Sequence, residues 1–211
     1  MSMSIEGRLL AEKLADAGIS TFILEYRVDP TPETPAAFQA SLLDAMTQPR
    51  IGQGPELYQL DSVVRARLDA ATALQYLHDH QQELNIDITR LGVLGFSAGA
   101  ITAMAVALED VDVNQPAFVG AIYGSMAAVT PLADPPPLFV AMASDDPLFE
   151  HEGFGLIESW HAAGGSTELH WYANGGHGFG ARTQHTTSDR WLGQFLAWLE
   201  SRGILVGNAN Q

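Results

Sequence analysis

The chain has 211 residues, of which 46% are hydrophobic, so it is long and apolar enough to bury a sizeable core within one domain. Its formal net charge of −15 disfavours nucleic acids and membranes as partners, because an acidic surface repels their phosphate groups. The absence of cysteine excludes disulfides, thiolate metal sites and a cysteine nucleophile, and no stretch has the pattern of a transmembrane helix or a signal peptide, so we expect a cytoplasmic protein.

The N-terminal part of the sequence predicts one helix, one strand and a long connection. Residues 5–17 carry apolar side chains at helical spacing, and Gly18 predicts the end of that helix. The β-branched and aromatic stretch 21–26 predicts a strand. Residues 29–60 then include five prolines and one short helical pattern at about 36–46. A connection of this length favours a lid or a pocket-wall insertion.

The remaining sequence alternates helical and strand patterns. A helical pattern over 62–84 leads into a short apolar run that ends at Phe96. Beyond this run we predict strands at 117–123, 138–143 and 167–172, and helices at 150–163 and 187–202. This alternation indicates an α/β fold with a mainly parallel sheet and helices on both faces, and we expect residues 1–211 to form a single domain. In such a sheet a site lies beyond the carboxyl ends of the strands.

The stretch 90–103 reads RLGVLGFSAGAITA and contains the motif G-x-S-x-G between a predicted strand and an Ala-rich helical segment. Gly95 and Gly99 let the backbone reverse sharply, and the turn holds the hydroxyl of Ser97 clear of the sheet. This context predicts a nucleophile elbow. A Gly/Ser turn that only packs a helix against a strand is the alternative explanation.

A serine nucleophile needs a base within hydrogen-bond reach and a group that orients the base. Of the seven histidines, His177 follows a predicted strand within the glycine-rich stretch GGHGFG, and we predict that it is the base. The acid is Asp145 or Asp146, at the end of the preceding strand. We favour Asp146, because Pro147 fixes the turn just after it. The order Ser97, Asp146, His177 is a hydrolase order.

Other groups near the predicted elbow complete this hypothesis. The backbone N–H of Ala98, at the start of the elbow helix, is the expected first donor of an oxyanion hole. Phe96, Phe149 and Phe179 flank the three residues and are predicted to line an apolar acyl pocket, with core packing as the simpler alternative for each. We expect no metal and no other cofactor, because the histidine pairs lack a third ligand and no dinucleotide fingerprint occurs.

The sequence resembles the α/β-hydrolase superfamily, and more narrowly bacterial esterases of the acetyl-xylan-esterase-like and dienelactone-hydrolase-like groups. The matching stretches are EGRLLAEKLADAGISTFILEYRV, RLDAATALQYL, RLGVLGFSAGA, SDDPLF and GGHGFG. The resemblance implies ester hydrolysis through an acyl-serine intermediate, in which Ser97 attacks, His177 moves the proton and Asp146 orients the histidine. Dienelactone hydrolases proper use a cysteine nucleophile. With a serine at position 97, the chain resembles the esterases more than those enzymes.

The N-terminal part of the sequence departs from the esterase pattern. In such esterases a strand and an HGGG-type loop precede the first helix and supply the second oxyanion donor, whereas no His-Gly-Gly sequence occurs here before Gly176. We therefore expect an N-terminally shortened fold. Either the strands at 21–26 and 91–94 pair directly, or another copy of the chain fills the gap in a homo-oligomer.

Three functions follow as alternatives. The first is a serine carboxylesterase that acts on short acyl esters as small-molecule substrates, with acetylated sugars among the candidates. The second is a serine peptidase of the same fold. It would need charged groups that bind a peptide terminus, and Glu25 and Arg27 are the candidates. The third is a catalytically weakened or non-catalytic binding protein, because the second oxyanion donor is missing.

Overall fold

The computed structural model describes residues 3–30, 32–47, 54–109, 115–149 and 152–205. Within these residues the chain forms a parallel four-stranded sheet with the order β1-β2-β3-β4. The strands are β1 (Val93–Phe96), β2 (Val119–Ile122), β3 (Leu138–Ala143) and β4 (Thr167–Tyr172). The predicted parallel sheet is therefore confirmed, and β3 and β4 have the bounds that the sequence predicts.

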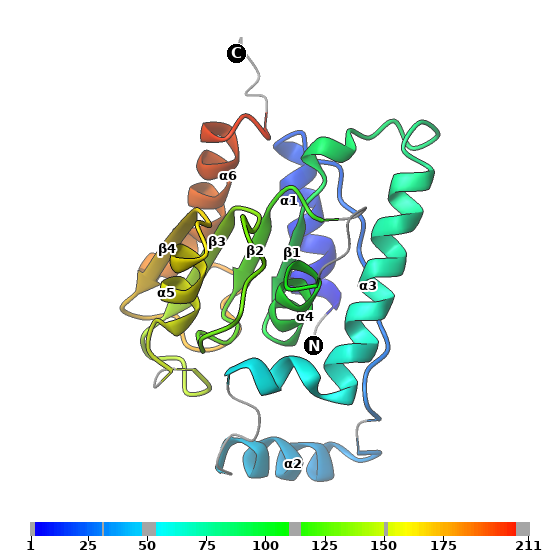
Figure 1. The fold of residues 1–211 in the computed structure, drawn as a ribbon. Helices are drawn as coiled ribbons and strands as arrows, with labels where there is room; N and C mark the ends of the chain where they lie inside the picture. The colour runs from blue at the N-terminus through cyan, green and yellow to red at the C-terminus, as the bar shows by residue number, and fades with distance from the viewer. Residues whose placement is uncertain (1–2, 31, 48–53, 110–114, 150–151, 206–211) are drawn as a thin grey trace.

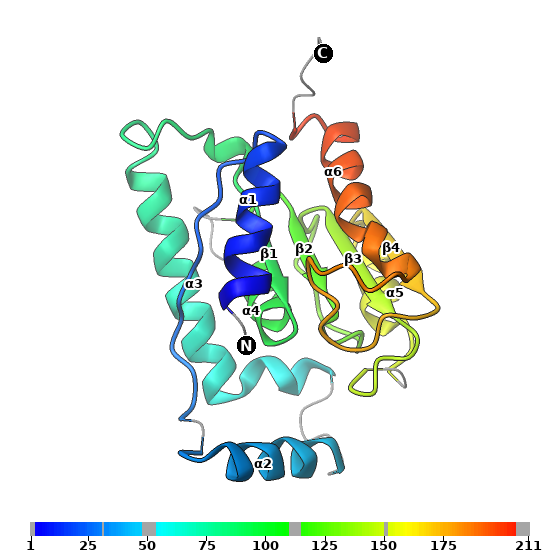
Figure 2. The ribbon, with the colours of Figure 1, turned by 180° about the vertical axis from the view of Figure 1, so that it is seen from behind.

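Helices cover both faces of this sheet. The helices are α1 (Leu9–Asp16), α2 (Pro35–Thr47), α3 (Asp61–Asp79), α4 (Ala98–Ala107), α5 (Gly155–Ala162) and α6 (Trp191–Ser201). In Figure 1, α4 and α5 lie in front of the sheet and α3 packs beside α4, whereas Figure 2 shows α1 and α6 on the opposite face. A π-helical turn, Met3–Arg8, leads into α1, and 3₁₀ turns precede α3, β1 and α6.

The two central strands form the middle of the hydrophobic core. Every residue of β2 and β3 is buried, as expected for parallel strands that are covered on both faces. Aromatic side chains of α6 pack beneath them: Phe195 contacts Phe139 of β3 and Phe118 just before β2, with ring centroids 5.2 and 6.0 Å apart. This packing holds the amino ends of β2 and β3 against α6.

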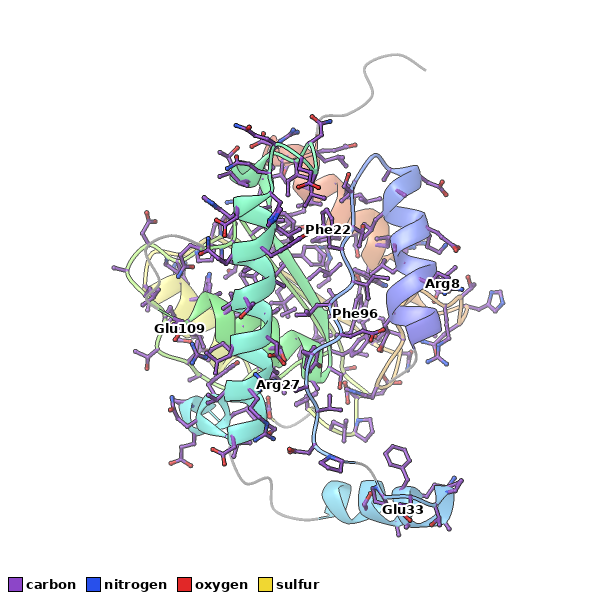
Figure 3. All side chains as sticks on the ribbon, turned by 90° about the vertical axis from the view of Figure 1, so that its right-hand side faces the viewer. Arg8, Phe22, Arg27, Glu33, Phe96 and Glu109 are labelled. Carbon is purple, nitrogen blue, oxygen red and sulfur yellow. The ribbon has the colours of Figure 1, made fainter. Side chains whose placement is uncertain are left out.

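The predicted strand at 21–26 is wrong. Residues 19–30 form neither helix nor strand, and no strand among the described residues pairs with the outer edge of β1. β-propensity cannot make a strand without a partner ladder. The segment runs beside α3, where Asp69 accepts hydrogen bonds from the backbone N–H and the guanidinium of Arg27 at 2.8 and 2.7 Å. Figure 3 shows the segment crossing between α3 and α1, with Phe22 and Arg27 labelled along it.

Two helices are shorter than the sequence pattern predicts. The helix expected at 62–84 ends at Asp79, and the chain reverses through Asn85, which has a positive φ of 51°. The helix expected at 150–163 begins at Gly155, where a Cβ would approach the backbone nitrogen of Ala128 to 2.7 Å. Its first two residues, 150 and 151, lie outside the described part of the chain.

The described parts of the connection over 29–60 lie on the side of the sheet where the strands end. α2 corresponds to the helix predicted at about 36–46. It lies beyond the carboxyl ends of the strands, apart from the main body of the fold (Figure 1). Tyr58, near the end of the connection, is buried and belongs to the main core cluster. The role of 29–60 as a lid or pocket wall stays a prediction. None of the described helices is both long and apolar enough to span a bilayer.

Candidate active site

Ser97 is the first residue after β1 and stands in a sharp strand-to-helix turn. Its backbone has φ 53° and ψ −119°, a conformation that costs free energy for a residue with a side chain. The turn is tight enough that a Cβ at Gly95 would lie 2.0 Å from the carbonyl oxygen of Gly99. The N–H of Ser97 donates to the carbonyl of Ile122 at 3.0 Å, which extends the ladder between β1 and β2 by one bond. The predicted elbow geometry is therefore present.

His177 reaches the elbow from the loop after β4. Its Nε2 lies 2.8 Å from the hydroxyl oxygen of Ser97, although the two residues are 80 positions apart. Gly176 and Gly178, on either side of it, have φ values of 62° and 78°, a region that glycine enters at little cost. These two glycines let a short loop turn the imidazole back toward β1.

Asp146, at the end of β3, is the carboxylate that contacts the imidazole. Its side chain is fully buried, with Oδ2 2.8 Å from Nδ1 of His177 and Oδ1 accepting the N–H of Leu148 at 2.9 Å. Because an ionised carboxylate only accepts hydrogen bonds, it selects the tautomer that carries the proton on Nδ1. Nε2 is then left to accept from the Ser97 hydroxyl.

Asp145 has a different task. It is exposed, and its Oδ1 accepts the N–H of Gly176 at 2.8 Å. This backbone hydrogen bond holds the pKa of Asp145 below its usual value. The side chain therefore anchors the loop that carries His177, whereas Asp146 contacts the imidazole itself.

The model of the dienelactone hydrolase family matches residues 40–200, which is most of the chain. The chain belongs to the dienelactone hydrolase family. None of the curated proteins compared with it matches.

Solved structures resemble this dienelactone hydrolase family member in fold. An acetyl ester-xyloside bifunctional hydrolase from Caldicellulosiruptor lactoaceticus is 23% identical with a TM-score of 0.67, and the match covers 94% of this chain and 77% of that one. A carboxylesterase from Lactobacillus plantarum WCFS1 is 16% identical with a TM-score of 0.68, covering 96% and 82%. An α/β hydrolase from a Medee basin deep-sea metagenome library is 25% identical with a TM-score of 0.56, covering 67% and 65%. The predicted α/β-hydrolase fold is confirmed.

Ala98 begins α4 directly after Ser97. The first backbone N–H groups of a helix have no partner within the helix, and the helix dipole adds partial positive charge there. This N–H is accordingly available to a developing negative charge beside Ser97. The Ala98 donor stays a prediction, and we assign no second donor among the described residues.

The three predicted pocket phenylalanines occupy different surroundings. Phe96 and Phe179 are buried in the main core cluster. Phe149 is only partly buried, and its ring lies 5.8 Å from that of His177. Phe149 is thus the one of the three that combines solvent access with a position beside the imidazole.

Two residues of the site were not foreseen from the sequence. Tyr123, directly after β2, packs its ring against His177 with centroids 5.2 Å apart. Its hydroxyl donates to the carboxylate of Glu6, in the π-helical turn, at 2.8 Å. Burial and the neighbouring Glu6 charge both raise the pKa of Tyr123, so the phenol stays protonated at neutral pH. The position of Tyr123 at a strand's carboxyl end was a usable signal, whereas nothing local marked Glu6.

The other described histidines lie elsewhere. His170 contacts Glu168 on β4, with Nε2 2.8 Å from the carboxylate oxygen, and His80 stacks on Tyr76 at 4.0 Å. Within the described ranges, no three His, Asp or Glu side chains come together in a group that could hold a metal ion.

Proposed function

We propose that this member of the dienelactone hydrolase family is a serine carboxylesterase that hydrolyses short acyl esters through an acyl-serine intermediate. One observation carries the proposal: Ser97, His177 and Asp146 form a continuous chain of two 2.8 Å hydrogen bonds. The chain begins at a strained elbow and ends at a fully buried carboxylate. This is the arrangement that converts a weakly nucleophilic hydroxyl into an attacking group.

Acylation uses each of the three hydrogen-bonded residues once. The Ser97 oxygen bonds to the ester carbonyl carbon while its proton passes to Nε2 of His177. The carbonyl oxygen becomes negative and receives a hydrogen bond from the N–H of Ala98. His177 then gives the proton to the leaving alkoxide as the carbon–oxygen bond breaks, and the alcohol departs.

Deacylation repeats the steps with water. Nε2 takes a proton from a water molecule, whose oxygen bonds to the acyl carbon, and then returns the proton to Ser97 as the carboxylic acid leaves. Asp146 accepts the hydrogen bond of the Nδ1–H group throughout and stabilises the imidazolium that forms in both halves. Its burial strengthens this interaction, because the local dielectric is low.

The substrate is proposed to be a short acyl ester, with acetylated sugars as one class. Phe149 offers an apolar contact beside His177 that suits a small acyl group. The fold neighbour from Caldicellulosiruptor lactoaceticus is described as an acetyl ester-xyloside hydrolase, which makes acetylated sugars a reasonable first set to screen. A peptidase is less well supported, because the Arg27 guanidinium is already held by Asp69 on α3.

Replacement of the nucleophile tests this proposal. Ser97→Ala should lower kcat for p-nitrophenyl acetate by about 10⁴-fold or more, since the covalent route is lost. Ser201→Ala is the matched control, because Ser201 is an exposed serine at the end of α6 whose hydroxyl bonds only the carbonyl of Trp198 among the described contacts. Its activity should equal that of the wild type.

A fluorophosphonate probe separates the proposed esterase from a non-catalytic protein of the same fold. Wild type and Ser201→Ala should form a covalent adduct on Ser97, detected by intact mass and peptide mapping, and Ser97→Ala should not. A wild-type chain that hydrolyses no ester and takes no label would establish the non-catalytic alternative. A preference for aminopeptide over ester substrates would favour the peptidase.

A further inference from the structure

We propose that Tyr123 is a positioning residue for His177, and that Glu6 fixes Tyr123 by accepting the hydrogen bond of its hydroxyl. The inference rests on the proposed esterase function, because it concerns the base of that reaction. It assigns a task to a buried tyrosine and an N-terminal carboxylate that the hydrolytic steps above do not use.

The backbone gives Tyr123 the same place on β2 that Ser97 has on β1. Phe96 and Ile122 are partners in the register of the two strands, and Ser97 and Tyr123 are the residues that follow them. Both have positive φ values, 53° and 41°, although neither is glycine. The N–H of Tyr123 donates to the carbonyl of Ala141 on β3 at 2.8 Å, so the ladder holds this reversal in place. A strained conformation with a large side chain indicates that the side chain itself is needed there.

The ring of Tyr123 lies between two residues of the histidine loop. It meets His177 in a T-shaped contact with centroids 5.2 Å apart and Phe179 in another at 4.6 Å. The loop between these two residues passes through Gly178, whose positive φ reflects a flexible residue type. The imidazole must face Ser97 and Asp146 at once, so its tilt has little freedom. A fully buried ring on one side limits that tilt.

Glu6 in turn limits the motion of Tyr123. Its Oε1 accepts the Tyr123 hydroxyl at 2.8 Å, across 117 positions of sequence. The π-helical turn that carries Glu6 continues into α1, which is anchored in the core by Leu10 and Leu14. The phenol is therefore held at both ends, by the strand ladder at its backbone and by a helix-borne carboxylate at its hydroxyl.

A purely structural role for Tyr123 is the competing explanation, and Tyr172 provides the matched control. Tyr172 is also a buried tyrosine at the end of a strand, its hydroxyl bonds Gln194, and its ring contacts Phe179. Among the described residues, the rings of Tyr123 and Phe149 contact His177, and that of Tyr172 does not. Truncation of either ring should destabilise the fold, but only truncation of Tyr123 should disturb the imidazole.

The experiment compares Tyr123→Leu, Tyr123→Phe, Glu6→Ala and Tyr172→Leu with the wild type, using p-nitrophenyl acetate. Tyr123→Leu should lower kcat about 100-fold, because a small displacement of the base has an effect of this order, with KM changed by no more than about threefold. Tyr123→Phe should restore most of the lost kcat, since the ring returns. Glu6→Ala should fall between them. Tyr172→Leu should keep kcat within about threefold of the wild type.

A spectroscopic readout accompanies the kinetics. The Nδ1 proton of His177, shared with Asp146, should give a resolved low-field proton NMR signal in the wild type and in Tyr172→Leu. The signal should broaden or vanish in Tyr123→Leu. Equal kcat losses in Tyr123→Leu and Tyr172→Leu, or an unchanged kcat in both Tyr123→Leu and Glu6→Ala, would overturn the inference. If Tyr123→Leu does not fold, Glu6→Ala decides, because an unchanged kcat and an unchanged NMR signal in that variant would refute the positioning role.

Failure of the inference is distinguishable from failure of the proposed function. If Ser97→Ala retains full activity, the esterase mechanism itself is wrong, whatever the tyrosine variants do. If Ser97→Ala is inactive while Tyr123→Leu behaves like Tyr172→Leu, the mechanism stands and Tyr123 is only a core residue.

Discussion

Asp146→Asn is the substitution that examines the proposed site most closely. The carboxylate of Asp146 accepts two hydrogen bonds, from the N–H of Leu148 at 2.9 Å and from Nδ1 of His177 at 2.8 Å. Asparagine has one acceptor oxygen and one donor NH₂ in the same space. If the amide oxygen keeps the Leu148 bond, the NH₂ group faces Nδ1, which must then give up its proton. The imidazole proton moves to Nε2, where it blocks the transfer from Ser97.

The magnitude follows from the two bonds. The opposite amide orientation leaves the buried N–H of Leu148 facing another donor, which costs about 1–3 kcal/mol and so favours the inactive tautomer by that amount. Loss of the negative charge beside the imidazolium costs a further ~1.5–3 kcal/mol in the transition state. Together these effects lower kcat by about 10²–10⁴-fold, the upper end matching the loss typical of a triad histidine held in the wrong tautomer.

Asp145→Asn is the control for the same assay. Asp145 is the neighbouring residue with the same side chain. Its carboxylate accepts the Gly176 N–H, and an amide oxygen can do the same. With p-nitrophenyl acetate at saturation, we expect kcat of Asp145→Asn within about threefold of the wild type. Equal losses in the two variants, or a larger loss in Asp145→Asn, would refute the assignment of Asp146 as the acid.

Two further predictions concern stability. Gly95→Ala should lower the free energy of unfolding by about 3 kcal/mol or more, because the new Cβ would stand 2.0 Å from a backbone oxygen. Gly193→Ala, with open space in α6, should raise it by about 0.5–1 kcal/mol. Urea unfolding measures both free energies, and shifts of equal sign would contradict the reasoning. Arg27 lowers the pKa of Asp69, so the pair stabilises the fold above the unfolded pKa and loses this effect as pH falls through the folded pKa. Arg27→Met should therefore melt below the wild type at pH 7, with the difference shrinking below about pH 4; a constant difference across that range would rule out the ion pair as the cause.

Much of the fold could be predicted from local patterns, and the exception shows why. The continuous apolar run of β3 marks a buried parallel strand. The bounds of β3 and of the partly buried β4 both agree with prediction. Residues 21–26 have equally strong β-propensity, yet they form no strand. Pairing depends on a partner edge that is distant in sequence, and β1 does not provide one to this segment. The ion pair of Arg27 with Asp69 holds the chain instead.

The candidate site also contains residues that local patterns predict and one that they do not. Ser97, Asp146 and His177 were predictable because each follows a strand, and the carboxyl ends of parallel strands meet at one edge of the sheet. The choice of Asp146 over Asp145 agrees with the hydrogen bonds of the structure, although the catalytic roles stay proposals. Glu6 could not be predicted, because no local pattern relates it to a tyrosine 117 positions away.

The geometry of the strand ends explains how Ser97 and Tyr123 are held in place. Ser97 and Tyr123 each reverse the backbone with a positive φ just past the last register pair of β1 and β2. Such conformations cost of order 1–3 kcal/mol each, so the surrounding packing must offset them. The bonds from Ser97 to Ile122 and from Tyr123 to Ala141 tie both reversals to the next strand. Both side chains then meet His177 from fixed positions, so the proposed reaction would need no binding energy to arrange its base.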